Sequence, residues 1–154
     1  MWPYSEREAV FLEPAHPRGE LAARTLAMPA DTNPAGDIFG GWIMSMMDAA
    51  GAMTATRLAG GRVVTAAVTK MSFLQPVKVG DVVCCYTDVV NTGRTSLTLC
   101  VEVWVLRQGQ GERVKVTEAE FTFVAVGEDG RPRELASSVA PIFSKKSRQP
   151  GASR

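Results

Sequence analysis

Asp48 is the residue of this sequence whose surroundings most clearly suggest chemistry. It is the one ionisable side chain in the nineteen residues from Ile38 to Thr56, where apolar and small residues surround it. A carboxylate in such surroundings loses hydration, which disfavours its charged form and makes it a stronger base. One interpretation is a general base or nucleophile. The other is structural, with Asp48 pointing out through a gap in the packing or paired with a distant arginine.

A second candidate site is the glycine-rich stretch before Asp48. Residues 37–41 read Asp-Ile-Phe-Gly-Gly and are expected at the start of a helix. Backbone N–H groups there lack partners within the helix, and the helix dipole is positive, so the position suits an anion or an oxyanion. Gly40 and Gly41 let a ligand approach the backbone closely. A glycine-rich helix start is a weak signal by itself, and no Gly-Lys-Ser/Thr follows to make it a phosphate-binding P-loop.

The other reactive residue types exclude several kinds of site. The single histidine, His16, cannot build a multi-histidine zinc centre, and its neighbours His-Pro-Arg-Gly predict an exposed loop. Cys84, Cys85 and Cys100 form no CxxC pair and lie in apolar runs. We therefore interpret them as buried structural thiols, which suit a reducing compartment.

Length and composition indicate one globular domain. The chain has 154 residues, of which 45% are hydrophobic and 21% charged, and its formal net charge is +1. This near-neutral balance argues against a broad nucleic-acid-binding surface. The first ten residues lack the basic start and apolar run of a signal peptide, and no uncharged apolar run reaches the ~18 residues of a membrane span. We therefore expect a cytoplasmic protein without membrane association.

The elements that must position these residues are one helix and five strands. Trp42–Leu58 is rich in Met, Ala and Leu and ends before Gly60-Gly61, which predicts a helix that is apolar, and so buried, on nearly all sides. The small residues around Gly51 predict close packing against a sheet or a partner helix. Strands are expected at Glu20–Met28, Arg62–Leu74, Val82–Val90, Thr95–Leu106 and Arg113–Val126.

The strand pattern predicts an α+β fold in the order β-α-β-β-β-β. Loops of about 4–7 residues between the later strands favour antiparallel neighbours, and such a sheet buries one face by wrapping the helix. Alternate residues from Leu97 to Val105 are apolar and should share one face. In the last strand the apolar phase slips between Val116 and Ala119, which predicts a β-bulge.

Several separate blocks of the sequence resemble one family. They are RTLAMPADTNPAGDIFGGWIMSMMDAAG, RVVTAAV, MSFLQPVKVGDVV, NTGRTS, VEVWV and TEAEFTFVAV. In this order they are similar to the bacterial acyl-CoA thioesterases of the hotdog fold, nearest to the short acyl-CoA hydrolase branch (YciA-type). The resemblance covers about residues 20–130, which we take as the hotdog domain. Residues 1–19 are expected to form an irregular arm and residues 131–154 a polar, flexible tail.

This resemblance implies an activity and an assembly. The activity is hydrolysis of acyl-CoA to a free carboxylic acid and CoA, with no metal and no organic cofactor. The assembly is a homodimer in which two hotdogs share a continuous sheet. In many members three dimers associate further into a hexamer.

The resemblance also implies roles for particular residues. The family's catalytic carboxylate falls on Asp48, and the polar residue of the preceding loop falls on Asp37. The helix-start amide that polarises the thioester carbonyl falls on Gly40 or Gly41. Either Asp37 or Asn33 is expected to orient the attacking water.

The CoA part of the substrate is expected to follow another segment. The resemblance implies that Gly93, Arg94, Thr95 and Ser96 line its path. Arg94 is the cation that we assign to the CoA phosphates, because it lies in this motif. The other cations that could meet the phosphates are ordinary surface charges in the simpler interpretation: Arg57, Arg62, Lys70, Lys78, Lys145 and Lys146.

One departure from related hotdogs bears on the choice of function. Many of them carry histidine where this chain has Phe39, and hotdog hydroxyacyl dehydratases depend on a catalytic histidine. With His16 as the sole histidine, in the N-terminal arm, a dehydratase is the less favoured alternative. The other alternative is a non-catalytic module that binds or senses acyl-CoA. Such a module needs a pocket but no carboxylate in the position of Asp48.

The spacing of the assigned residues has a consequence for the assembly. Gly40 and Asp48 are eight residues apart, which is about 12 Å along one helix. One thioester carbonyl cannot lie within about 3 Å of both. If both act on one substrate they come from different subunits, so the active site lies at a dimer interface. Whether Asp48 activates water or attacks the thioester to form a mixed anhydride stays open.

Overall fold

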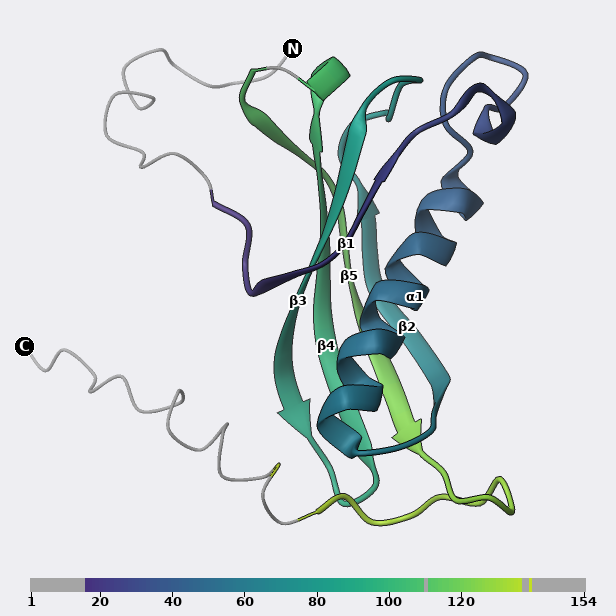
Figure 1. Cartoon of the computed structure of the whole chain (residues 1–154), viewed down its shortest axis with the longest axis vertical. Coiled ribbons are helices and arrows are strands. Elements are labelled where there is room, and N and C mark those ends of the chain that lie inside the picture. The colour runs from purple at the N-terminus through teal and green to yellow at the C-terminus, as the bar shows by residue number, and fades with distance from the viewer. Residues whose placement is uncertain (1–15, 110, 137–138, 140–154) are drawn as a thin grey trace, which may run out of the picture.

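A computed structural model describes residues 16–109, 111–136 and 139. One long helix crosses the concave face of a sheet (Figure 1). The predicted order β-α-β-β-β-β is confirmed. The elements are β1 (Glu20–Leu26), the short 3-10 helix η1 (Pro29–Asp31), α1 (Gly40–Ala59), β2 (Val63–Phe73), β3 (Val82–Thr92), β4 (Ser96–Leu106), the 3-10 turn η2 (Arg107–Gly109) and β5 (Arg113–Ala125).

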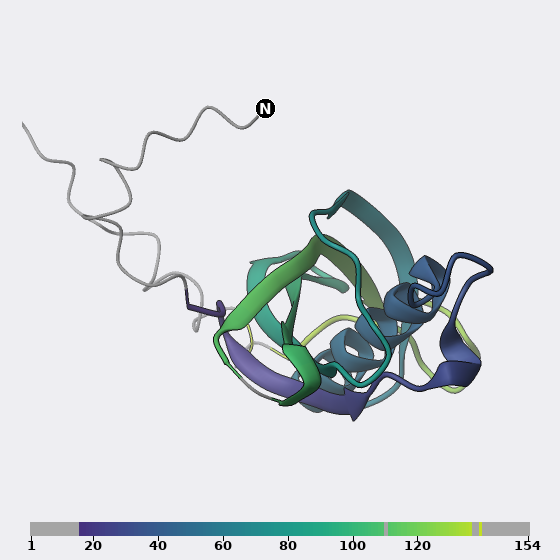
Figure 2. The ribbon, with the colours of Figure 1, turned by 90° about the horizontal axis from the view of Figure 1, so that it is seen from above.

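The five strands form one antiparallel sheet in the order β1-β3-β4-β5-β2. The antiparallel pairing expected from the short loops is confirmed. However, β2 and β3 are consecutive in the chain without being neighbours, because β2 pairs with β5. Both β1 and β2 are therefore edge strands. The sheet curls around α1, as the view from above shows (Figure 2).

The core lies between α1 and the inner face of the sheet. Alternate residues of β4 are almost completely buried, which confirms the shared face predicted from the sequence: Leu97, Leu99, Val101, Val103 and Val105. On the neighbouring strand Phe121 and Phe123 stack with ring centroids 6.2 Å apart. These side chains form the surface on which the helix rests.

The bulge predicted in the last strand is confirmed. Val103 of β4 pairs with Thr117, but the next residue, Trp104, pairs with Lys115. Val116 is therefore the extra residue, and its side chain is buried. This extra residue accounts for the slip of the apolar phase in the sequence.

The helix starts earlier than the sequence predicted. It begins at Gly40, with Phe39 as N-cap, whereas the prediction began at Trp42. At the other end Gly60 has φ 68, and its N–H donates to the carbonyl of Thr56. This left-handed cap is the conformation that glycine adopts with least strain, and it ends the helix where the glycine pair predicted.

The expectation that α1 is buried on nearly all sides is wrong for the single chain. The buried residues lie on one face: Ile43, Met47, Ala50, Gly51, Ala55 and Ala59. Met44 and Met53, on other faces, keep 41% and 53% of their surface exposed. One sheet can cover only one side of a helix, and within the described residues no second layer covers the other side.

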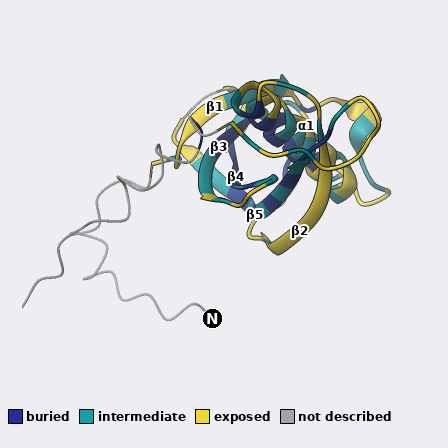
Figure 3. Cartoon of the chain, turned by 90° about the horizontal axis from the view of Figure 1, so that it is seen from below, coloured by how far each residue is buried: buried dark blue, intermediate teal, exposed yellow. Residues whose placement is uncertain are grey.

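The edge strand β2 is the most exposed part of the sheet. Of its eleven residues, all but two are exposed (Figure 3). Apolar side chains are among them, with Val64, Val68 and Phe73 at 39%, 40% and 51% exposure. A long edge strand with exposed apolar side chains is a surface on which another strand can pair.

Parts of both ends of the chain lie outside the described residues: 1–15 of the N-terminal arm, and 137, 138 and 140–154 of the C-terminal tail. Residues 131–136 run beside the domain, where Arg133 donates a hydrogen bond to the carbonyl of Ala59. The part of the chain that the structure describes contains no helix with the length and hydropathy needed to cross a membrane.

The contact beneath Gly51 gives a stability prediction. A Cβ on Gly51 would lie 2.8 Å from Cε2 and Cζ of Phe123, so the glycine lets the helix approach the sheet, one of the two packings expected. Because Phe123 is fully buried, Gly51→Ala should cost about 1–3 kcal/mol in overpacking, more than the ~1 kcal/mol gained in helix propensity. Thermal unfolding would show a lower Tm. Thr56→Ala, at an exposed helix position, is the control and should not lower it.

Candidate active site

Asp48 lies near the middle of α1 and is half-buried. Its Oδ1 accepts a hydrogen bond of 2.6 Å from the hydroxyl of Thr65 on β2. Among the described residues no arginine pairs with the carboxylate. The hydrogen bond to Thr65 lies at an exposed position of the single chain.

The first turn of α1 presents unpaired backbone donors. The N-cap residue, Phe39, makes no side-chain cap, and its carbonyl accepts from the N–H groups of Trp42 and Ile43. In the described residues the N–H groups of Gly40 and Gly41 have no acceptor, and the first turn carries no acidic side chain. The positive end of the helix dipole and two free donors therefore coincide, which suits a developing oxyanion.

The loop before the helix is shaped by Asn33. Its Oδ1 accepts from the N–H groups of Ala35 and Asp37 at 3.0 and 3.1 Å, and its own N–H donates to the carbonyl of Asp37 at 2.7 Å. These bonds occupy Asn33 with the loop backbone. Of the two residues expected to orient water, Asp37 carries the carboxylate that lies at the helix start. Asn33 instead holds the backbone of the loop that contains Asp37.

Asp37 has a cationic partner from a different loop. Its Oδ1 pairs with Nζ of Lys78, in the segment between β2 and β3. The loop backbones are also joined, because Ile38 N–H donates to the carbonyl of Val77 at 2.9 Å. Lys78, which the sequence offered as a CoA-phosphate cation, is thus engaged at the helix start.

A buried carboxylate holds the loop that carries Lys78. Asp81 is fully buried and accepts from the backbone N–H of Lys78 at 2.9 Å and from Nη1 of Arg107 at 2.5 Å. The N–H of Gln108 is a third donor, at 3.3 Å. A buried carboxylate with this many donors is satisfied, so Asp81 acts as a structural support of the site.

An apolar cavity of about 250 Å³ opens beside Gly40. A Cβ on Gly40 would stand 3.7 Å from Cζ of Phe73, so the end of β2 lies against the start of α1. Gly40, the first residue of α1, lines the cavity. Its apolar lining consists of Ile38, Ile43, Phe73, Leu74, Pro76 and Val77.

The segment assigned to the CoA path lies at the opposite end of the helix. Residues 93–95 join β3 to Ser96, the first residue of β4, at the end of the molecule where α1 finishes (Figure 1). Gly93 N–H donates to the carbonyl of Ser96 in a tight turn, and Arg94 forms an exposed ion pair of 3.0 Å with Glu134. Such an exposed pair is weak, so Arg94 can exchange it for a phosphate. Thr95 and Ser96 flank it, half-buried.

The chain is similar to proteins of one known family. A profile described as the Thioesterase superfamily matches residues 35–112. The chain belongs to this superfamily. It is 58% identical over 122 residues to the acyl-CoA thioester hydrolase YciA of Salmonella typhimurium, covering 77% of this chain and 92% of the relative. It is 57% identical to the YciA of Escherichia coli over the same shares.

Solved structures of thioesterases have the same fold. The hexameric thioesterase of Yersinia pestis is 58% identical, with a TM-score of 0.76 over 79% of this chain and 99% of that one. A hexameric hotdog fold thioesterase of Campylobacter jejuni is 44% identical, with a TM-score of 0.77 over 82% and 97%. The expected hotdog fold is thereby confirmed.

The superfamily match covers most of the residues assigned from the sequence. It includes Asp37, Gly40, Gly41 and Asp48 together with residues 93–96, whereas Asn33 lies just before it. Within one chain the structure does not bring these residues together. The helix-start amides lie at one end of α1, the carboxylate of Asp48 near its middle, and the turn between β3 and β4 at the end of the molecule where α1 finishes.

Two contacts of the candidate site were not predicted from the sequence, those of Thr65 with Asp48 and of Asp81 with the loop of Lys78. In the sequence Thr65 is a hydroxyl in a strand and Asp81 an acid in a turn. A polar residue facing a lone carboxylate could have been sought, but the alignment of helix and strand is set by tertiary packing.

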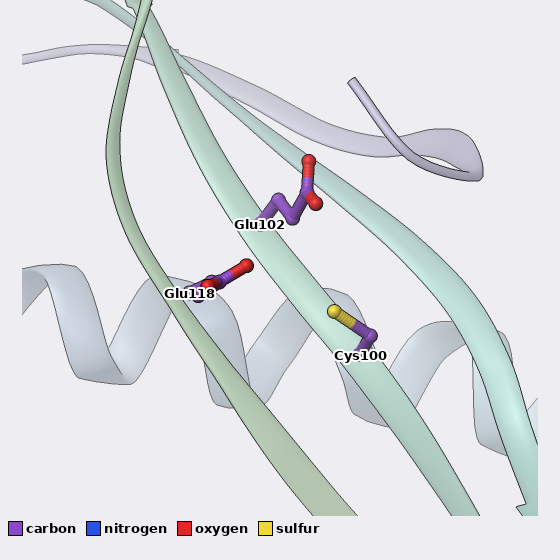
Figure 4. Close-up of side chains that lie close together, drawn as sticks. All are labelled: Cys100, Glu102 and Glu118. Atoms are coloured by element: carbon purple, nitrogen blue, oxygen red, sulfur yellow. The ribbon is translucent and has the colours of Figure 1, made fainter. Parts of the chain in front are cut away.

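A cluster of Cys100, Glu102 and Glu118 on the outer face of the sheet has potential metal ligands (Figure 4). Lys115 already occupies it, donating to Oε1 of Glu102 at 3.3 Å and Oε2 of Glu118 at 2.6 Å. Burial by itself lowers the pKa of Lys115, but the bond to Glu118 and the charge of Glu102 outweigh it and raise that pKa. The ammonium is therefore held charged, and the cluster is an ion-pair network.

The cysteines are buried and free, as interpreted from the sequence. Burial raises the pKa of the Cys85 thiol to about 12 and also raises the pKa of Cys100. Protonated thiols are poor nucleophiles and poor metal ligands. His16 is exposed, as expected.

Proposed function

We propose that this protein hydrolyses the thioester bond of acyl-CoA to give a free carboxylic acid and CoA. The observation that carries the proposal is the carboxylate of Asp48, held by Thr65 on a helix whose first amides are free. The two YciA relatives and a solved structure titled a broad specificity acyl-coenzyme A thioesterase support the substrate class.

The chemistry divides between backbone and carboxylate. The thioester oxygen accepts from the N–H of Gly40 or Gly41, and these donors stabilise the negative charge that develops when the carbonyl is attacked. Asp48 either removes a proton from the attacking water or attacks the carbonyl itself to form a mixed anhydride. Asp37, fixed by Lys78, orients the water. No metal and no organic cofactor takes part, and the Arg94 segment receives the CoA phosphates.

The active site is shared between two chains. Asp48 bonds to residue 65 of β2, whereas Gly40 contacts residue 73 of the same strand. If two β2 edges pair antiparallel about a twofold axis near Thr69, residue 65 of one chain lies opposite residue 73 of the other. Asp48 of one subunit then faces the Gly40 amides of its partner. The exposed β2 edge supports this dimer.

The dimer associates further. Met44 and Met53 of α1 remain exposed in the single chain. Exposed apolar groups of this kind suit burial by other subunits. The solved structures of related thioesterases are described as hexameric, so we propose a trimer of dimers. The three free thiols support a reducing compartment, the cytoplasm.

Replacement of Asp48 tests the carboxylate. Asp48→Asn keeps the shape and an acceptor for Thr65 but removes the base, so turnover should fall by several orders of magnitude with an unchanged fold. Thiol release from a panel of acyl-CoAs measures it, with circular dichroism as the folding control. Near-normal turnover would show that Asp48 is not the catalytic group.

The same assay separates the alternatives. A binding module would release no thiol even in the wild type. For an active enzyme, single-turnover hydrolysis in isotopically labelled water distinguishes the two routes, because label incorporated into Asp48 requires the anhydride.

Gly40→Pro tests the backbone donor. Proline is well tolerated at the first helical position, and Phe39 already has the extended conformation (φ −63, ψ 129) that a following proline requires. The substitution deletes one N–H, so kcat should fall about 10²–10³-fold if that group holds the oxyanion. Gly40→Ala keeps the N–H and is the matched control. Full activity of Gly40→Pro would mean that the N–H of Gly40 does not hold the oxyanion, which would leave the N–H of Gly41 as the donor.

Mixing two inactive variants tests the shared site. In a mixed dimer of Asp48→Asn and Gly40→Pro, one site has both defects and the other has none. Random pairing makes half of the dimers mixed, so activity should recover to about a quarter of the wild-type value. Each variant alone, carried through the same refolding, is the control. No recovery would mean that both groups act from one chain.

A further inference from the structure

The turn at residues 77–81 is tied to two other segments through its backbone. The N–H of Ile38, just before α1, donates to the carbonyl of Val77 at 2.9 Å. The N–H of Ala27, just after β1, donates to the carbonyl of Asp81 at 3.0 Å. The turn therefore joins the end of β1 to the start of α1, so a shift of the turn would be felt at the helix start.

The side chain of Asp81 ties the same turn to the β4–β5 hairpin. Its Oδ2 accepts from the backbone N–H of Lys78 at 2.9 Å and from Nη1 of Arg107 at 2.5 Å. Its Oδ1 accepts from the N–H of Gln108 at 3.3 Å. Because Asp81 is fully buried, its charge needs a cationic partner, and among the described residues Arg107 is the cation paired with it.

Gln108 adopts a costly conformation at this contact. Its φ of 48 and ψ of 35 lie in the left-handed region, which is unfavourable for a residue that has a side chain. Such a conformation persists where the surrounding contacts fix it. Here the N–H donates to Asp81, and a Cβ on Gly80 would lie 3.8 Å from Cγ of Gln108. The start of the hairpin is therefore fitted closely to the turn at residues 77–81.

Two of these hydrogen bonds share one oxygen. Oδ2 of Asp81 accepts both from Arg107 and from the backbone N–H of Lys78. Without the guanidinium, the buried carboxylate would keep only neutral backbone donors, and an uncompensated buried charge favours rearrangement. The backbone of Lys78 would then lose the acceptor that fixes its direction. Since Nζ of Lys78 pairs with Asp37, this disturbance would reach the helix start.

We propose that Arg107 is a positioning residue that, through Asp81, holds Lys78 in place. This inference rests on the proposed function, in which Asp37 is fixed by Lys78 and orients the attacking water. Arg107 itself touches no reacting atom, because it belongs to η2 and meets the site only through the turn at residues 77–81.

Substitutions of Arg107 test the proposal. Arg107→Met keeps a long side chain and removes the charge, so kcat should fall about three- to thirtyfold, as for changes along a contact network, with KM within about twofold. Arg107→Lys restores a cation, and because Arg107 donates to Asp81 through Nη1 alone, kcat should recover to within about threefold of the wild type. Arg113→Met, at an exposed position of the same hairpin, is the matched control and should leave kcat unchanged.

A double variant separates positioning from a loss of stability. Lys78→Met should lower kcat to a similar extent, because it removes the contact with Asp37 that Arg107 supports. Adding Arg107→Met to Lys78→Met should then lower kcat no further, although thermal unfolding should show a lower Tm. A purely structural role of Arg107 would instead reduce kcat by the same factor in both backgrounds.

Three outcomes would overturn the inference. They are an unchanged kcat in Arg107→Met, equal losses with and without Lys78, and a lysine variant no better than methionine. If Arg107→Met does not fold, Arg107→Gln, which keeps a neutral donor, takes its place in the same comparisons. None of these results would touch the proposed function, which stands or falls on Asp48→Asn.

Discussion

The rigid length of α1 is the constraint on which the rest of the site depends. The helix-start amides and Asp48 are eight residues apart on one straight element, about 12 Å, and a helix cannot bend to close that gap. The contact of Gly51 with Phe123 also fixes the helix against the sheet. A reaction that needs both groups must therefore draw them from two copies of the chain.

The edge strand β2 contacts both parts of the candidate site. Its first half holds Asp48 through Thr65, and its last residue, Phe73, lies against Gly40. Since antiparallel pairing of identical edges exchanges the two halves of a strand, the exposed edge of β2 would complete two sites in the proposed dimer. In that proposal one strand serves folding, assembly and catalysis.

The proposed chemistry needs few side chains because backbone amides supply part of it. Two other polar residues near the site hold the loops around it through hydrogen bonds to backbone N–H groups. Asp81 fixes the segment that carries Lys78, and Asn33 shapes the turn that carries Asp37. The three cysteines are buried free thiols, and Lys115 fills the one acidic cluster with metal-ligand geometry found in the described residues.

The sequence by itself determined the element order, the face of β4, the bulge near Val116 and the family, because periodicity, glycine placement and motif order are local properties of a chain. It also singled out Asp48 as the candidate catalytic group. It overestimated the burial of α1, since an apolar surface does not reveal whether a sheet or another subunit covers it. Only the tertiary structure decided that β2 pairs with β5 and that Thr65 meets Asp48. Those contacts depend on the register and height of a helix over a strand, which long-range packing sets.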